Sequence, residues 1–532
     1  MTILLGPVLH LERGAPGLWR FSVHLLTNLP GAPAPALQIA FDAPDVVVGP
    51  PQLVANFPAH GRSLWCFVAE VPRVGLERWL TYTLEGDGEP RTFDKVAIPA
   101  SGKLPRITFF SCNGFSSEAL MRSTSDPYAL WQQMLKEHGL GLDGGNHDSP
   151  SGIHVLVGGG DQIYADSLPV LRELDDMAHR DLRRLRSSVD RRDRALREYL
   201  NLYQQRWSQP DVAAMLARVP VVFTWDDHDI FDGWGSHGED IQSNPAYLDV
   251  FDSARMAFRA FQLGGVGNSA GRAPSLLAPA NNPGDDHFMQ SVILHGGGQE
   301  LEVLLLDLRS NRTPVRVLSE KQWSDLKGLL STRKALPNTQ PHLLVVASIP
   351  VVHMRFKAVG WILRNLVPGA QEVEDDLLDQ WEHPDHLGER ARMIMTLLQH
   401  QQRSGYRVTI LSGDVHAGAL GRIESTRPEH RQPGHVDAAR ILQITSSGIV
   451  HPSPSTWERY FLELLGTDGR DEVTSGVTTE MLPIDSATDR LWARNFLILD
   501  VEGADASVPH QLWARFIAEG RVVAQVVTVP PC

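Results

Sequence analysis

The sequence predicts an α/β fold preceded by an all-β segment, and three observations support this. Short apolar runs separated by Pro and Gly fill residues 1–103, where helical periodicity is weak. From residue 104 onward, runs rich in β-branched residues alternate with helical stretches, which is typical of α/β layering. Three of those runs, residues 153–157, 221–224 and 408–411, lead into turns that carry Asp, His or Tyr. Because metal ligands must converge at one edge of a rigid sheet, this pattern indicates a two-metal hydrolase.

Residues 1–103 contain short strand-like runs bounded by turn residues, for example 19–26, 63–68 and 80–84. Regular short strands over about 100 residues are typical of an immunoglobulin-like or fibronectin-like β-sandwich. The string IPASGKLP at residues 98–105 supplies Pro, Ser and Gly in sequence. We therefore predict an N-terminal domain that ends at residue 103.

We assign residues 104–532 to a catalytic domain, with a helical insertion at about residues 169–218. Its expected strands and helices alternate along the chain. The strands are expected at 107–111, 153–157, 221–224, 301–306, 343–348, 408–411, 441–444 and 496–501, and the helices near 127–138, 247–263, 319–330 and 388–402.

Composition narrows the classes of function. The chain has 532 residues, of which 42% are hydrophobic and 21% charged, as in an ordinary globular protein. The formal net charge of -14 argues against general nucleic-acid binding, because nucleic-acid binders need basic surface to displace counterions. No run approaches the ~20 apolar residues of a membrane-spanning helix. The N-terminus lacks an export signal and the three cysteines suit a reducing compartment, so we expect a cytoplasmic protein.

The string GDQIYAD, residues 160–166, offers the first two candidate metal ligands. The glycines before Asp161 let the chain turn sharply off its strand and hold the carboxylate over the sheet edge, where it can bridge two cations. Tyr164 follows three residues later, so one turn of chain brings its phenolate oxygen toward the same ion.

The string WDDHD, residues 225–229, places Asp227 beside His228. Their side chains diverge, so Asp227 is expected to bind a metal while His228 addresses the substrate. His228 would then stabilise charge in the transition state or protonate the leaving group, a role worth roughly 10²–10⁴-fold in rate. Asp226 and Asp229 either support the ligands or are solvated.

The string GDVH, residues 413–416, adds Asp414 and His416, which face the same way on an extended chain and reach neighbouring ions. Cys112, after the first strand of the α/β region, is the remaining soft donor, although a buried cysteine is by itself usually inert packing.

The candidate ligands divide by softness into two sets that share one carboxylate. One set suits a redox-capable ion such as Fe(III), and the other, made only of oxygen donors, suits a hard divalent ion. The first set is Cys112, Tyr164, His416 and Asp161; the second is Asp161, Asp227 and Asp414.

Arg309 closely follows the strand-like run LEVLLLD. A guanidinium at a strand end can clamp a non-bridging phosphate oxygen in bidentate fashion, which would make Arg309 catalytic. The alternative is a salt bridge between Asp307 and a neighbouring arginine.

In their order along the chain, these strings resemble the motifs of the PhoD-like alkaline phosphatases of the calcineurin-like metallophosphatase superfamily. The family's motifs are Ser-Cys, GDxxY, DDH and GDxH, and here they stand at residues 111–112, 160–164, 226–228 and 413–416. The resemblance implies a four-layer α-β-β-α sandwich behind the N-terminal β-sandwich. It also implies an iron plus calcium centre, with Mn, Zn or Mg as alternative metals. Family members carry Asn-Asn-Trp after the third motif, whereas this chain offers Asp232 there.

We therefore expect a metal-dependent phosphoesterase, in which a metal-bound hydroxide attacks the phosphorus of a small phosphate ester in line. The sequence does not decide between monoesters and diesters, and a phospholipase D-like phosphodiesterase acting on a lipid or nucleotide diester is the alternative enzyme. A catalytically silent metal-binding scaffold or binding module is the alternative from another class. Retention of every acidic ligand together with His228 argues against the silent module.

Overall fold

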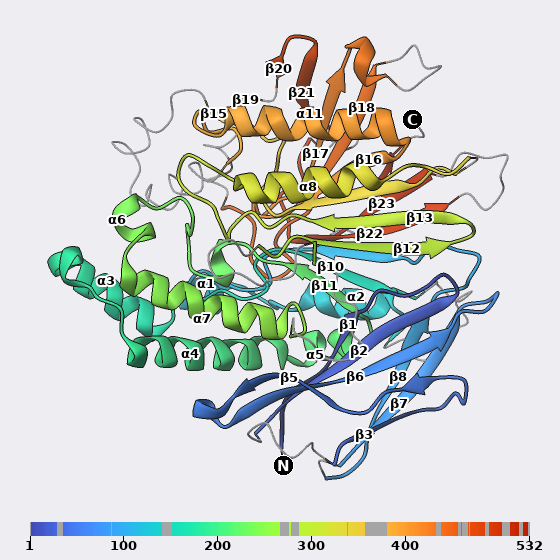
Figure 1. Ribbon diagram of the computed structural model, residues 1–532, viewed down its shortest axis with the longest axis vertical. Helices are drawn as coiled ribbons and strands as arrows, with labels where there is room; N and C mark the ends of the chain where they lie inside the picture. Colours follow the sequence, from blue (N-terminus) through green and yellow to red (C-terminus); the bar gives the residue numbers. More distant parts are fainter. Residues whose placement is uncertain are drawn as a thin grey trace.

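The computed structural model describes most of the chain, and two large β-sheets dominate it (Figure 1). The described residues are 2–28, 36–86, 88–140, 152–265, 276–277, 287–337, 339–356, 380–431, 438–455, 459, 466–467, 469–484, 489–502, 511–520 and 525–529.

The first sheet has eleven strands and combines the N-terminus, the middle and the C-terminus of the chain. In spatial order its path is β24 (Gln525–Val529), β23 (Gln511–Ala518), β22 (Asn495–Glu502), β9 (Ile107–Phe110), β10 (Val155–Gly159), β11 (Val221–Thr224), β1 (Ile3–Leu11), β2 (Leu18–Thr27), β6 (Arg62–Pro72) and β4 (Val47–Val48), and β5 (Gln52–Phe57) also pairs with β6.

The second sheet has eight strands, and two small sheets complete the set. The order of the second sheet is β12 (Gln290–Gly296), β13 (Gln299–Leu305), β14 (His342–Ala347), β16 (Arg407–Ser412), β18 (Ala439–Thr445), β17 (Ala419–Ser425), β21 (Val477–Leu482) and β20 (Asp471–Thr474). The small sheets consist of β3 (Gln38–Phe41), β7 (Arg78–Glu85) and β8 (Arg91–Ile98), and of β15 (Arg355–Phe356) and β19 (Gly466–Thr467).

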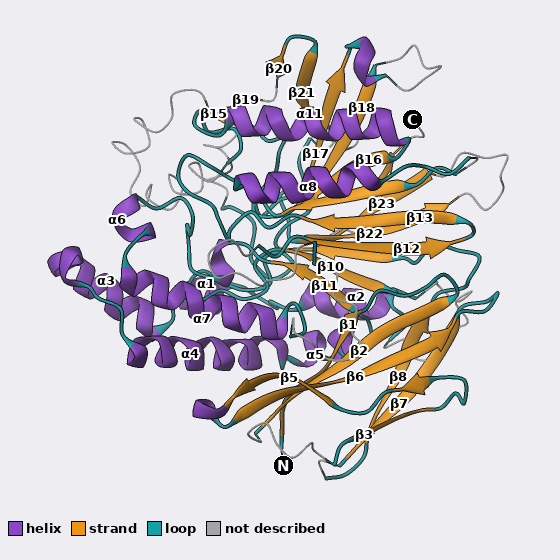
Figure 2. Cartoon of the chain, in the orientation of Figure 1, coloured by secondary structure: helices purple, strands orange, loops and turns teal. Residues whose placement is uncertain are grey.

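Helices pack against the outer faces of both large sheets, as Figure 2 shows for α8 and α11 on one side and α4 and α7 on the other. Apolar residues of the two sheets, such as Val157 and Leu344, meet in a single cluster between them. The α-helices are α1 (Glu118–Ser123), α2 (Ala129–Glu137), α3 (Pro169–Asp181), α4 (Val189–Trp207), α5 (Pro210–Leu216), α6 (Glu239–Gln242), α7 (Pro245–Phe261), α8 (Glu320–Thr332) and α11 (Leu387–Ser404).

Helices α3, α4 and α5 occupy the segment for which the sequence predicts a helical insertion. Helix α4 begins after Ser188, whose hydroxyl accepts a hydrogen bond from the backbone of Arg191 and so caps the helix. Its apolar face, which includes Tyr199 and Tyr203, is buried in the cluster beneath the first sheet. Among the described helices, none is long and apolar enough to cross a membrane.

The N-terminal strands continue the first large sheet. Strand β1 pairs in parallel with β11, with His10 opposite Val221. Leu9 and Phe21 lie in the apolar cluster between the two large sheets. The segment is rich in strands, as the sequence predicts, but its strands share a sheet and a core with the α/β region. The division at residue 103 therefore stays a prediction.

Removing residues 1–103 is expected to abolish cooperative folding of the remaining chain, because β11 would lose one of its two parallel partners and the cluster would lose Leu9 and Phe21. Thermal unfolding followed by circular dichroism measures this. A truncated chain with the same sharp transition as the full chain would show that residues 1–103 are an independent domain.

Candidate metal centre

The candidate ligands lie where the carboxyl ends of parallel strands from both sheets meet. Strands β9, β10 and β11 are parallel neighbours in one sheet, and β14, β16 and β18 in the other. The turns approach so closely that only glycine fits at two points. A Cβ on Gly160 would lie 2.8 Å from the Cβ of Asp226 and 3.1 Å from that of Ser348, and one on Gly413 would lie 2.5 Å from Ser111 Oγ. This packing explains the glycine that begins each GD string.

Four of the candidate ligands have left-handed backbone conformations. The φ angles are +56° at Cys112, +55° at Asp161, +70° at Asp414 and +50° at His416. Among the described residues only two other non-glycine residues have positive φ. Since this conformation costs roughly 1–2 kcal/mol for a residue with a side chain, such strain persists only where the surroundings enforce it, and it gathers at functional sites.

The soft donors lie together in a buried part of the centre. Cys112 Sγ is 3.3 Å from Asp161 Oδ2, and the Tyr164 hydroxyl is 3.4 Å from His416 Nε2. Cys112, Tyr164 and Asp161 are at most 2% exposed. Burial raises the pKa of the Cys112 thiol, and the nearby Asp161 carboxylate raises it further. These groups therefore need a cation nearby to become anionic ligands.

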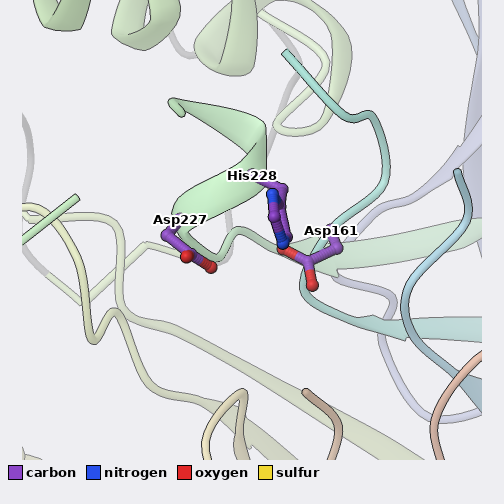
Figure 3. Close-up of side chains that lie close together, drawn as sticks. All are labelled: Asp161, Asp227 and His228. Atoms are coloured by element: carbon purple, nitrogen blue, oxygen red, sulfur yellow. The ribbon is translucent and has the colours of Figure 1, made fainter. Parts of the chain in front are cut away.

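Asp161, Asp227 and His228 form a group whose ligand atoms lie within 4.8 Å of one another (Figure 3). Asp161 Oδ1 is buried and has no hydrogen-bond partner among the described residues. A buried carboxylate oxygen without a partner is costly in a folded protein, and a bound cation would remove that cost. The residues present therefore fit a metal ion.

The side chain of His228 is held on two sides. Its Nδ1 lies 2.9 Å from Asp166 Oδ1, which also accepts a hydrogen bond from the backbone of Asp232 at 2.8 Å. The ring of Tyr164 stacks on the His228 ring at 4.2 Å. Burial lowers the pKa of His228, but the carboxylates of Asp166, Asp227 and Asp161 raise it more, and the net shift is upward. Figure 3 shows a ring nitrogen of His228 directed at Asp161.

Asp414 and His416 complete the set on a more open side. The carboxylate of Asp414 accepts a hydrogen bond from Gln380 Nε2 at 3.0 Å, and its backbone oxygen lies 3.9 Å from Cys112 Sγ. The structure does not place Asp414 in the group of three that contains Asp161. Asp414, His416 and His228 are half-buried, whereas Cys112, Tyr164, Asp161 and Asp227 are buried. A substrate would therefore reach the centre from the side of these three residues.

Asp229 joins two of the ligand turns and is 1% exposed. Its Oδ1 accepts hydrogen bonds from the backbones of Gln162 and Ile163 at 3.0 and 3.1 Å and from Gln262 Nε2 at 2.8 Å. Its Oδ2 accepts one from the backbone of Asp226 at 3.0 Å. Burial raises the pKa of Asp229 to about 7, although these hydrogen bonds oppose the rise. Asp229 therefore supports the ligands rather than being solvated.

Comparison with known proteins identifies the family and the fold of the chain. The sequence matches the model of the PhoD related phosphatases over residues 106–374 and 362–486. The chain belongs to this family. The uncharacterized protein YGR266W of Saccharomyces cerevisiae is 26% identical over 461 residues, which cover 74% of this chain and 63% of that relative. The chain thus spans less than two thirds of the length of that protein.

A solved structure described as that of PhoD superposes with a TM-score of 0.55 and 15% sequence identity, covering 98% of this chain and 88% of the other. This likeness shows that the mixed α/β fold is shared. Membership of this family implies metal ions, which agrees with the group formed by Asp161, Asp227 and His228.

Arg309 of this family member lies beside the carboxylates of Asp226 and Asp227 and is fully buried. Its Nε pairs with Asp226, its Nη2 is 3.1 Å from Asp227 Oδ1, and its Nη1 donates to the carbonyl of Trp234 at 3.0 Å. Asp307 accepts a hydrogen bond from the backbone nitrogen of Arg309 at 3.1 Å. The guanidinium thus faces protein carboxylates and not solvent.

The roles of several residues of the centre depend on contacts with residues far away in the sequence. Asp166 ends the GDQIYAD string, but only its contact with His228, 62 positions away, reveals its role. The same holds for Gln380, whose partner Asp414 is 34 residues distant. The candidate replacement ligand Asp232 meets Asp166 through its backbone and is not part of the group of three.

Replacing Arg309 with Met is expected to lower the free energy of unfolding of the metal-free protein by about 3–5 kcal/mol, because Asp226 and Asp227 would stay buried without their cation. Denaturant unfolding measures this, with Arg309→Lys as the control that keeps the charge. Unchanged stability together with a raised KM would contradict the assignment and show that the guanidinium binds substrate.

Proposed function

We propose that this protein hydrolyses phosphate monoesters or diesters at a centre of two unlike metal ions. The observation that carries the proposal is the convergence of two kinds of donor on Asp161, with strained backbone at four of the candidate ligands. One ion would be held by Cys112, Asp161, Tyr164 and His416, and the other by Asp161, Asp227 and Asp414.

The donor chemistry supports Fe(III) in the first position and Ca(II) in the second, with Mn, Zn or Mg as alternatives. Thiolate, phenolate and imidazole suit a redox-capable ion, whereas carboxylates suit a hard divalent one. When bound, the ions supply Lewis-acid stabilisation of phosphoryl charge and lower the pKa of bound water. The two large sheets with helices on their outer faces support the four-layer arrangement of the superfamily.

His228 is the catalytic side chain in this proposal. Asp166 accepts a hydrogen bond from Nδ1–H, which directs Nε2 toward the centre, and Tyr164 fixes the plane of the ring. The imidazole is then able to hold a proton at Nε2 for the leaving-group oxygen. Because His228 is only half-buried, a phosphate ester can approach it.

Arg309 has a positioning role in this proposal, because its guanidinium is bound to the carboxylates of Asp226 and Asp227. By fixing Asp227 it fixes a ligand, and it does not itself contact substrate. The alternative of a silent binding module is disfavoured, because such a module has no chemical reason to keep strained backbone at Cys112, Asp161 and Asp414.

Replacing Asp161 with Asn is expected to remove both ions and all hydrolysis, since this carboxylate is shared by the two proposed sets. Elemental analysis of the purified protein, together with hydrolysis of an aryl phosphate and a bis-aryl phosphate, measures both effects. Wild-type protein with no bound metal and no turnover of either ester would refute the proposed function.

Replacing His228 with Ala is expected to leave the metal content unchanged and to lower kcat roughly 10²–10⁴-fold, because proton transfer is lost but no ligand is. The same elemental analysis and hydrolysis assay measure this. Loss of metal in the variant would instead make His228 a ligand, a role that its proximity to Asp161 and Asp227 also permits.

A further inference from the structure

The segment that follows β18, residues 446–451, contacts Ser111 and Cys112, although no motif marks it in the sequence. Ser111 Oγ donates to the carbonyl of Ser446 at 3.3 Å, and the backbone nitrogen of His451 donates to the carbonyl of Cys112 at 3.1 Å. The ring of His451 stacks on that of His416 at 3.7 Å. A turn of the second sheet thereby packs against Cys112 and His416.

Ser447, within this segment, contacts two of the proposed soft ligands with one hydroxyl group. Its Oγ lies 3.0 Å from Cys112 Sγ and accepts a hydrogen bond from the backbone nitrogen of His416 at 3.0 Å. Ser447 is fully buried, so neither contact is exchanged with solvent. The hydroxyl therefore fixes the sulfur of Cys112 and the strained backbone of His416 relative to each other.

The direction of the hydrogen bond between Ser447 and Cys112 follows from the neighbouring groups. The Ser447 oxygen already accepts from His416, which leaves its own proton to donate. A cysteine sulfur that binds a metal is a thiolate, which has no proton and only accepts, so in the metal-bound state this hydrogen bond runs from Ser447 to the sulfur. The proton of Ser447 is thus directed at the sulfur.

We propose that Ser447 is a positioning residue that donates a hydrogen bond to the Cys112 sulfur and so tunes the sulfur as a ligand of the soft metal site. The inference rests on the proposed function, because it requires Cys112 to bind a metal. A hydrogen bond to a ligating sulfur withdraws electron density from it and fixes its orientation, and partners of this kind support metal affinity. This role persists when a cation replaces the thiol proton.

The test uses Co(II) as the probe, because a thiolate bound to Co(II) gives a charge-transfer absorption band that reports on the sulfur directly. The metal-free full-length protein is titrated with Co(II), and a band that is lost in Cys112→Ser identifies the sulfur ligand. In Ser447→Ala the band is expected to move to longer wavelength, since the sulfur becomes a stronger electron donor. The dissociation constant for Co(II) is expected to rise roughly 10-fold.

Ser446→Ala is the matched control, because this substitution also removes a buried hydroxyl next to Ser447. The Ser446 hydroxyl donates to Asn495 Oδ1 at 2.6 Å and not to the sulfur of Cys112. The control substitution is expected to leave the position of the band unchanged. A band that does not move in Ser447→Ala, or that moves equally in Ser446→Ala, would overturn the inference.

Two further outcomes are distinguishable. If wild-type protein shows no band that depends on Cys112, the assignment of Cys112 as a ligand fails, and this inference fails with it. If Ser447→Ala does not fold, Ser447→Thr and Ser447→Val provide a pair of nearly equal volume in which only Thr keeps the hydroxyl. A band at the wild-type position in Ser447→Thr and a shifted band in Ser447→Val would support the donor role. Bands at the same position in both variants would overturn it.

Discussion

Three aspartates are buried next to one another at the junction of the two sheets, and the centre depends on how their charge is offset. Asp161, Asp226 and Asp227 are at most 5% exposed. Arg309 pairs with two of them, and His228 lies beside the third. Burying charges without compensation costs several kcal/mol per ion, so a site with an unpartnered Asp161 oxygen is electrostatically incomplete. Metal binding would therefore be linked to the stability of the folded protein.

The fold determines which charges meet. Both sheets contribute parallel strands whose carboxyl ends face the same region, and a single apolar cluster between the sheets fixes their relative position. Gly160 and Gly413 allow the turns to approach within contact distance. Asp229 then ties the turn after β10 to the turn after β11 through buried hydrogen bonds. The positions of the candidate ligands are thus set by packing before any ion binds, which is the condition for a preorganised centre.

Local strings predicted where the candidate ligands lie, because each ligand turn follows directly from its own strand. A glycine and an aspartate after a β-branched run place Asp161 and Asp414 correctly at strand ends, and the structure brings Cys112 close to Asp161 and Tyr164 close to His416. The roles of Asp166 and Ser447 were not predictable, since their partners lie far away in the sequence and Ser447 belongs to no recognisable string. Strand periodicity likewise identified strands before residue 103 but not that β1 would join β11, because periodicity records which face is buried and not which sheet the strand enters.

The two proposed donor sets differ in chemistry rather than in exposure. Each set contains one half-buried residue, His416 in the soft set and Asp414 in the carboxylate set, and its other members are buried. Together with the half-buried His228, these two residues form the more open side of the centre, from which substrate would reach it. The proposed asymmetry between the two ions therefore depends on the donor atoms, a thiolate and a phenolate in one set and carboxylates alone in the other.

X-ray diffraction recorded on both sides of the iron absorption edge, from crystals of the purified protein, tests the claim of two unlike ions sharing Asp161 most directly. We expect an iron anomalous peak bonded to Cys112 Sγ and Asp161, and a second ion without iron signal bonded to Asp161 and Asp227. Two ions of the same element, or an ion pair that does not contact Asp161, would contradict it.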